Sequence, residues 1–190
     1  SNGDGLDVAL KEAILGGVVV GPRVLACTRE FLTSGEQADG ENRSWFMGLR
    51  NHGLVRKLDG ADAWRQAVRE ELGRGCDVLK ISMSPGHGAS PVEEICYLTR
   101  AELDAAVGVA HDRGKLVRAH CTSRVAILEA ARAGVDIVDH ADKLDAACIE
   151  ALLESGATVC PSMLWSERFL QMAENWDHNA MPFPIGSGFP

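Results

Sequence analysis

Three residues that could bind a metal or act as nucleophiles each end a short apolar stretch: Lys80, His120 and His140. Each stretch opens after a glycine, at Gly75, Gly114 and Gly134 in turn. The spacing from glycine to polar residue is 5, 6 and 6 residues (80 − 75, 120 − 114 and 140 − 134). In a parallel α/β sheet the carboxyl ends of neighbouring strands lie at one edge, where ligands bind. The similar spacing predicts that the three side chains lie on one rung and share one site.

The two histidines favour metal chemistry. Neutral imidazole suits zinc and other borderline metals, and a bound metal lowers the pKa of its water towards neutrality. Lys80 is harder to interpret, because an ammonium group cannot ligate a cation. It is an ion-pair partner of Asp77 or of a loop carboxylate, a Schiff-base lysine, or a lysine whose charge has been removed by modification. Asp139 precedes His140, and strand alternation predicts that it points away from the site.

Composition narrows the function classes. The 190 residues are enough for one domain with a sizeable core. A net charge of −8 argues against a nucleic-acid partner. No apolar run approaches the roughly 20 residues that a membrane span needs. Six cysteines without a C-x-x-C pair indicate small buried residues in a reduced, cytoplasmic setting.

Helical and strand patterns alternate along most of the chain. Apolar periodicity and glycine ends predict helices over 6–15, 61–74, 123–133 and 145–155, and a further helix that opens with a capping box at Thr99–Glu102 and ends at Gly114. Strands are predicted over 23–28, 78–82, 116–120, 136–139 and 158–160, and long loops over 33–51 and 83–98. This alternation predicts a parallel sheet, either open and doubly wound or closed into a barrel. No nucleotide-binding glycine motif opens any of these helices, which counts against the common open-sheet folds.

Three runs of residues resemble a known family: Cys76-Asp-Val-Leu-Lys-Ile, Lys115-Leu-Val-Arg-Ala-His120 and Ala133-Gly-Val-Asp-Ile-Val-Asp-His140. Together with Gly21-Pro-Arg-Val-Leu-Ala and Glu154-Ser-Gly-Ala-Thr-Val-Cys-Pro161, they are similar to the amidohydrolase superfamily. The branch they resemble contains imidazolonepropionase-like and prolidase-like metal-dependent hydrolases. The resemblance extends over nearly the whole chain.

The resemblance implies a (β/α)8 TIM-type barrel that holds one or two divalent metals, zinc first among them. In that family a carboxylated lysine bridges two metals, a role that falls on Lys80. The roles of the two metal-binding histidines fall on His120 and His140. A metal-activated hydroxide would attack an amide, peptide or cyclic amide carbonyl of a small-molecule or dipeptide-like substrate. A homo-oligomer is compatible with these expectations.

The chain also departs from the family pattern. The first-strand His-x-His pair and the eighth-strand aspartate have no counterpart. An eight-unit barrel needs about 250 residues, so we expect an incomplete barrel of five or six β-α units over 1–190. A tyrosine common in the branch is replaced by Thr122, which we expect at the substrate. A glycine- and histidine-rich phrase is replaced by Ser34-Gly-Glu-Gln-Ala.

Other functions stay open at this point. A deaminase or a decarboxylase would use the same scaffold, because fold does not fix the reaction. A Schiff-base aldolase would use Lys80 as its nucleophile. A catalytically incomplete barrel fragment that binds partners, or half of a larger assembly, is the alternative outside the enzyme class.

Overall fold

Six parallel strands form one sheet in the computed structural model, which describes residues 5–36, 55–85, 94–164, 167–168 and 171. The strand order is β2-β1-β3-β4-β5-β6, and every neighbouring pair is parallel. The strands are β1 (Cys27–Leu32), β2 (Val55–Lys57), β3 (Val78–Ser82), β4 (Leu116–Cys121), β5 (Ile137–His140) and β6 (Thr158–Cys160). The predicted α/β class is confirmed, and the sheet has the repeated β-α units of an incomplete barrel.

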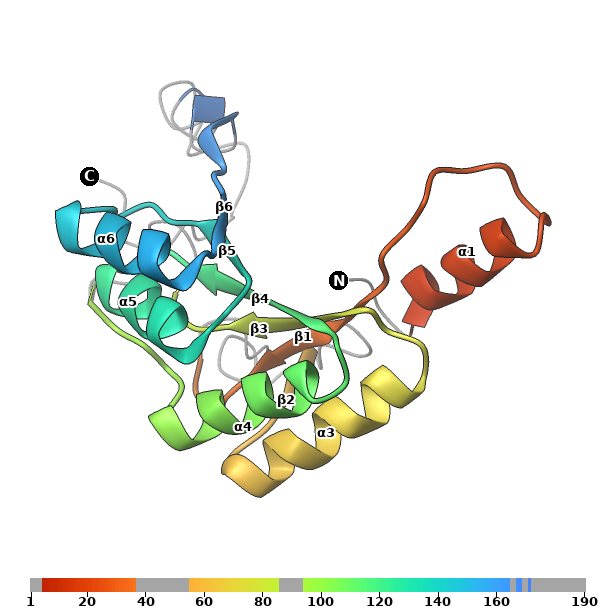
Figure 1. Cartoon of the computed structure of the whole chain (residues 1–190), viewed down its shortest axis with the longest axis horizontal. Coiled ribbons are helices and arrows are strands. Elements are labelled where there is room, and N and C mark those ends of the chain that lie inside the picture. The colour runs from red at the N-terminus through yellow and green to blue at the C-terminus, as the bar shows by residue number, and fades with distance from the viewer. Residues whose placement is uncertain (1–4, 37–54, 86–93, 165–166, 169–170, 172–190) are drawn as a thin grey trace, which may run out of the picture.

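Helices connect the strands and cover one face of the sheet. They are α3 (Ala61–Gly73), α4 (Arg100–His111), α5 (Arg124–Ala133) and α6 (Ala146–Ser155), while α1 (Leu6–Leu15) precedes the sheet. Figure 1 shows α3 to α6 along one side of the strands and α1 set apart beyond them. The strand residues that face these helices are apolar and fully buried, among them Phe31, Leu79, Ile81, Val117 and Val138. The opposite face, which we call the polar face, carries Glu30, Lys80, Arg118, His120 and Asp139.

The amino terminus of α4 has the predicted capping box. The Thr99 side chain accepts a hydrogen bond from the Glu102 backbone N–H, and Glu102 Oε2 accepts one from the Thr99 N–H at 2.9 Å. The second carboxylate oxygen of Glu102 accepts from the Gly60 N–H at 2.8 Å. Because Gly60 directly precedes α3, one buried carboxylate fixes the starts of two adjacent helices. The helix ends at His111 rather than at Gly114, which follows in a left-handed turn with φ of 63°.

The amino-terminal part differs from expectation. The strand predicted over 23–28 is wrong, since β1 runs from Cys27 to Leu32 and Leu25 is 60% exposed. Apolar residues therefore precede the strand instead of forming it. The pairing of β1 with β3 is irregular between Cys27 and Glu30, where the Lys80 N–H donates to the Thr28 side-chain oxygen at 3.0 Å. The three-residue strand β2 was not predicted, because it is too short to show alternation.

The loops predicted over 33–51 and 83–98 lie largely outside the described residues. The remaining helices and strands agree with prediction to within two residues at their ends. Ser123 and Asp145, predicted as the first residues of helices, are the N-caps of α5 and α6.

Replacement of Thr99 by alanine should destabilise the protein by about 1 kcal/mol, because an N-cap oxygen and half of the capping box are lost. Thr99→Ser keeps the hydroxyl oxygen and should lie close to the parent. Urea denaturation followed by circular dichroism measures both variants. Equal unfolding free energies for the alanine and serine variants would show that the cap does not stabilise α4.

Candidate metal centre

The strand register places Lys80 and His120 on the same face but at different levels. Lys80 pairs with Arg118, whereas His120 pairs with Ser82 on one side and Asp139 on the other. The expectation of one shared rung is therefore wrong. Two residues separate Gly75 from β3 (78 − 75 − 1), but only one separates Gly114 from β4 (116 − 114 − 1). With spacings of 5 and 6 residues from the glycines, Lys80 is the third residue of its strand (80 − 78 + 1) and His120 the fifth (120 − 116 + 1). Distance from a glycine does not determine position along a strand.

The two imidazole rings lie next to each other. The ring centroids of His120 and His140 are 4.6 Å apart, with an interplanar angle of 68°. His140 pairs in register with Cys121, a residue buried on the helix side, so regular alternation would turn it towards the helices. Instead its backbone is left-handed, with φ of 71°, and so is that of Ala141 at 53°. This departure from strand geometry accompanies the approach of the His140 ring to His120.

Hydrogen bonds orient both rings. His120 Nε2 lies 2.9 Å from the Pro85 carbonyl oxygen, and His140 Nδ1 lies 2.6 Å from Ser162 Oγ. A carbonyl oxygen can only accept, so His120 donates from Nε2, and Nδ1 is the acceptor nitrogen of the neutral ring. A metal-binding histidine usually donates its other ring N–H to a carbonyl or a carboxylate in this way.

The spacing of the rings fits a shared cation. Zinc–nitrogen distances of about 2.0–2.1 Å around a tetrahedral ion place two imidazole centroids roughly 5 Å apart. The observed 4.6 Å is close to that value. Within the described part of the chain, no group of three or more His, Cys, Asp and Glu residues could hold a metal ion. The described residues thus offer an imidazole pair that fits two positions of a metal site.

Lys80 is bound by two carboxylates. Its ammonium lies 2.9 Å from Asp139 Oδ2 and 3.8 Å from Glu30 Oε1, and its side chain is 11% exposed. The alternative of an ion pair with Asp77 is wrong, because Asp77 pairs with Lys11 and Lys115. With Arg118, the group contains two positive and two negative side chains. A carboxylated Lys80 would leave an excess of negative charge there, which a divalent cation would offset.

Asp139 also differs from expectation. It lies on the polar face with His120, its register partner, and its side chain is 4% exposed. It accepts hydrogen bonds from Lys80 at 2.9 Å and from Arg118 Nε at 2.7 Å. Burial opposes its ionisation, but the Arg118 hydrogen bond and the Lys80 charge outweigh burial and hold its pKa below the ordinary value. The prediction that strand alternation turns Asp139 away from the site is therefore wrong. Alternation places Asp139 on the polar face, and it is His140 that departs from regular strand geometry.

Two further polar residues lie at this end of the sheet. Glu36, which follows β1, is 1% exposed and accepts a hydrogen bond from Ser82 Oγ at 2.5 Å. Ser82 is at the level of His120, so this carboxylate lies at the same end of the sheet as the imidazoles. Sequence reasoning noted Ser34-Gly-Glu-Gln-Ala only for its missing histidine and overlooked the acid within it. Thr122 is half-buried and contacts Ser84 and Pro85, and its role at the substrate stays a prediction.

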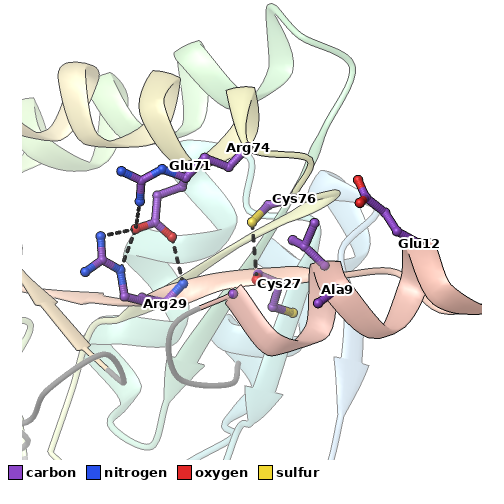
Figure 2. A pocket seen from close by; sticks show the side chains of 9 residues that line it. Ala9, Glu12, Cys27, Arg29, Glu71, Arg74 and Cys76 are labelled. Carbon is purple, nitrogen blue, oxygen red and sulfur yellow. Dashed lines mark hydrogen bonds and ion pairs between the residues drawn. The ribbon is translucent and has the colours of Figure 1, made fainter.

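A pocket lies away from the histidines. Figure 2 shows it between α1, the start of β1 and the end of α3, and its volume is about 410 Å³. The ion pair of Arg29 with Glu71, at 2.5 Å, forms part of its wall. Burial raises the pKa of the Cys76 thiol there to about 11, which disfavours a thiolate nucleophile. The pocket is at the amino-terminal ends of β1 and β3, opposite to the edge where β4 and β5 present their imidazoles.

Comparison with known proteins supports the family resemblance. No family model and no curated protein matches the chain. Among solved structures, a Xaa-Pro dipeptidase with bound methionine in its active site is 25% identical, with a TM-score of 0.80. An amidohydrolase is 31% identical with a TM-score of 0.75, and a prolidase complexed with N-methylphosphonate-L-proline is 28% identical with a TM-score of 0.75. They match 99%, 91% and 94% of this chain.

The chain spans less than half the length of these proteins, at 45%, 44% and 44%. The fold and the similar sequences confirm the resemblance to the amidohydrolase superfamily. More narrowly, the neighbours are prolidase- and amidohydrolase-like hydrolases. Among the described residues, no helix has the length and apolar character that a membrane span requires.

Replacement of Asp139 by asparagine should destabilise the protein by about 3 kcal/mol. The change leaves the charges of Lys80 and Arg118 facing a neutral amide, and removal of one partner from a buried ion pair costs about 3–5 kcal/mol. The lower end applies because the Arg118 side chain is 39% exposed. Chemical denaturation measures the difference, and Glu150→Gln on the exposed side of α6 is the matched control.

The difference should depend on pH. Because the pKa of Asp139 is lowered in the folded protein, its contribution is complete above the unfolded-state value of about 3.9 and is lost as pH falls through the folded value. The parent and the Asp139→Asn variant should therefore converge in acid. A constant difference down to about pH 2 would contradict the ion-pair explanation.

Proposed function

We propose that this protein is a metal-dependent hydrolase of amide or peptide bonds, with His120 and His140 as metal ligands and Lys80 as a third. The observation that carries the proposal is the imidazole pair, 4.6 Å apart at the carboxyl ends of neighbouring parallel strands. Active sites in barrel enzymes lie at this end of the strands. The hydrolase neighbours support the same class of reaction.

The substrate class we propose is a dipeptide-like amide, with an Xaa-Pro dipeptide as the first candidate. Two structural neighbours are a Xaa-Pro dipeptidase and a prolidase complexed with a phosphonate derivative of proline. A tetrahedral phosphonate resembles the species formed when water adds to an amide carbonyl, and enzymes bind such species more tightly than substrates. A small dipeptide-like substrate is compatible with the net charge of −8.

Each residue of the proposed site would have a distinct role. A bound divalent metal, zinc first, would supply an activated water and a polarised carbonyl. His120, held at Nε2 by Pro85, would direct Nδ1 towards the cation, and His140 would be oriented through its contact with Ser162. Lys80, in its carboxylated form, would supply oxygen ligands. Asp139 would bind Arg118 and keep that part of the polar face charged and ordered.

The imidazole pair favours the hydrolase over the Schiff-base alternative, which would use Lys80 as its nucleophile without a metal. The ion pairs of Lys80 do not separate the two interpretations, because a Schiff base and a carboxylated lysine both form from the neutral amine, whereas two carboxylates here bind the Lys80 ammonium. A deaminase or a decarboxylase would use the same metal site, so product analysis is needed to separate them from a peptidase.

Zinc binding tests the ligand assignment. We expect His120→Asn and His140→Asn each to weaken zinc binding at least tenfold, since the loss of even a residue that supports a ligand costs about 10–100-fold. Asparagine is the appropriate replacement at 140 because it tolerates the left-handed backbone. Isothermal titration calorimetry measures the affinity. His111→Asn is the matched control, because His111 lies on α4 and contacts Asp136.

Unchanged zinc affinity in the His120→Asn/His140→Asn double variant would refute the assignment. Circular dichroism of each variant shows whether it is folded, so that a loss of binding is not caused by unfolding.

Hydrolysis tests the reaction. We expect the zinc-loaded protein to release free proline from methionyl-proline, a chelator to abolish the release, and added zinc to restore it. Chromatography of the products distinguishes hydrolysis from deamination and decarboxylation. Covalent trapping of a carbonyl compound on Lys80 by cyanoborohydride, with activity insensitive to chelator, would instead establish the aldolase.

A further inference from the structure

We propose that Thr122 is a positioning residue for His120, and that it acts by holding the Pro85 carbonyl to which the imidazole donates. The inference rests on the proposed function only for its expected effect on zinc affinity, because His120 is a metal ligand in that proposal. The orientation of the ring is a property of the chain itself. This role differs from a contact with substrate.

One carbonyl oxygen receives two hydrogen bonds. Pro85 O lies 2.9 Å from His120 Nε2 and 2.7 Å from Thr122 Oγ1. A carbonyl oxygen has two lone pairs, so both donors can be accommodated. Thr122 therefore binds the same atom as His120 and fixes where that atom lies.

Ser84 completes the arrangement. Its Oγ accepts from the Thr122 backbone N–H at 2.7 Å and lies 2.9 Å from Thr122 Oγ1. Since the Thr122 hydroxyl proton is given to Pro85, the Ser84 hydroxyl must donate to Thr122. The donors and acceptors then form one chain. The Thr122 N–H donates to the Ser84 hydroxyl, the Ser84 hydroxyl donates to the Thr122 hydroxyl, and the Thr122 hydroxyl donates to the Pro85 carbonyl. Such chains strengthen their members cooperatively.

The surroundings keep this chain of bonds in place. Ser84 is fully buried, and the Met83 N–H donates to the His120 carbonyl at 3.1 Å, so the segment after β3 continues alongside β4. The Thr122 hydroxyl is thus committed to the protein, which counts against its use as a donor to substrate. What it stabilises is the His120 tautomer with its proton on Nε2.

The test compares two replacements of Thr122. Thr122→Val keeps the shape and removes the hydroxyl, whereas Thr122→Ser keeps the hydroxyl. Nitrogen-15 NMR of the His120 ring, at about pH 8.5 where an ordinary imidazole is neutral, reports which nitrogen carries the proton. We expect the Nε2–H form in the parent and in Thr122→Ser, and a mixture of tautomers in Thr122→Val. Zinc affinity should fall about tenfold in Thr122→Val alone.

The possible outcomes separate the two proposals. An unchanged tautomer and zinc affinity in Thr122→Val overturns the positioning role. An unchanged tautomer with a raised KM would assign Thr122 to substrate binding and also overturns it. If the tautomer shifts but the parent binds no zinc, the positioning role stands and the proposed metal site fails. Should Thr122→Val not fold, Ser84→Ala removes the other hydroxyl of the chain and must shift the tautomer in the same direction.

Discussion

The carboxylate of Asp139 is the constraint on which the polar face depends. It lies on β5 and accepts hydrogen bonds from Lys80 on β3 and from Arg118 on β4, so one buried group connects three consecutive strands. Buried charges are tolerated only when they are paired and hydrogen-bonded. This requirement explains why a face that looks away from the helices is charged rather than apolar.

At the carboxyl ends of β4 and β5, the protein itself orients the two rings. His120 is held by a main-chain carbonyl and His140 by a serine hydroxyl, while the strands beneath them are parallel and regularly paired. Functional side chains held by rigid elements and by supporting hydrogen bonds keep productive geometry better than side chains on loops. The sheet and the hydrogen bonds thus act at different scales, since the sheet brings two strand ends together and the hydrogen bonds fix the rotation of each ring.

Local signals in the sequence were enough to predict most elements. The capping box at Thr99, the N-caps Ser123 and Asp145 and the glycines after helices are short-range features, and they located α4, α5 and α6 to within two or three residues. Register is a relation between strands, and no single strand contains it. The prediction therefore missed the offset of Lys80 and the inward position of Asp139. Glu36 was missed because its burial arises from packing against β3, a contact between segments 46 residues apart (82 − 36).

The left-handed backbone of His140 has an energetic consequence for this strand end. A non-glycine residue in this conformation carries a strain of order 1–3 kcal/mol, and glycine would relieve it. Folding stability alone would therefore favour glycine at this position. An imidazole at this position therefore costs conformational free energy, and in return the His140 ring lies beside His120 while the neighbouring Asp139 side chain stays on the polar face.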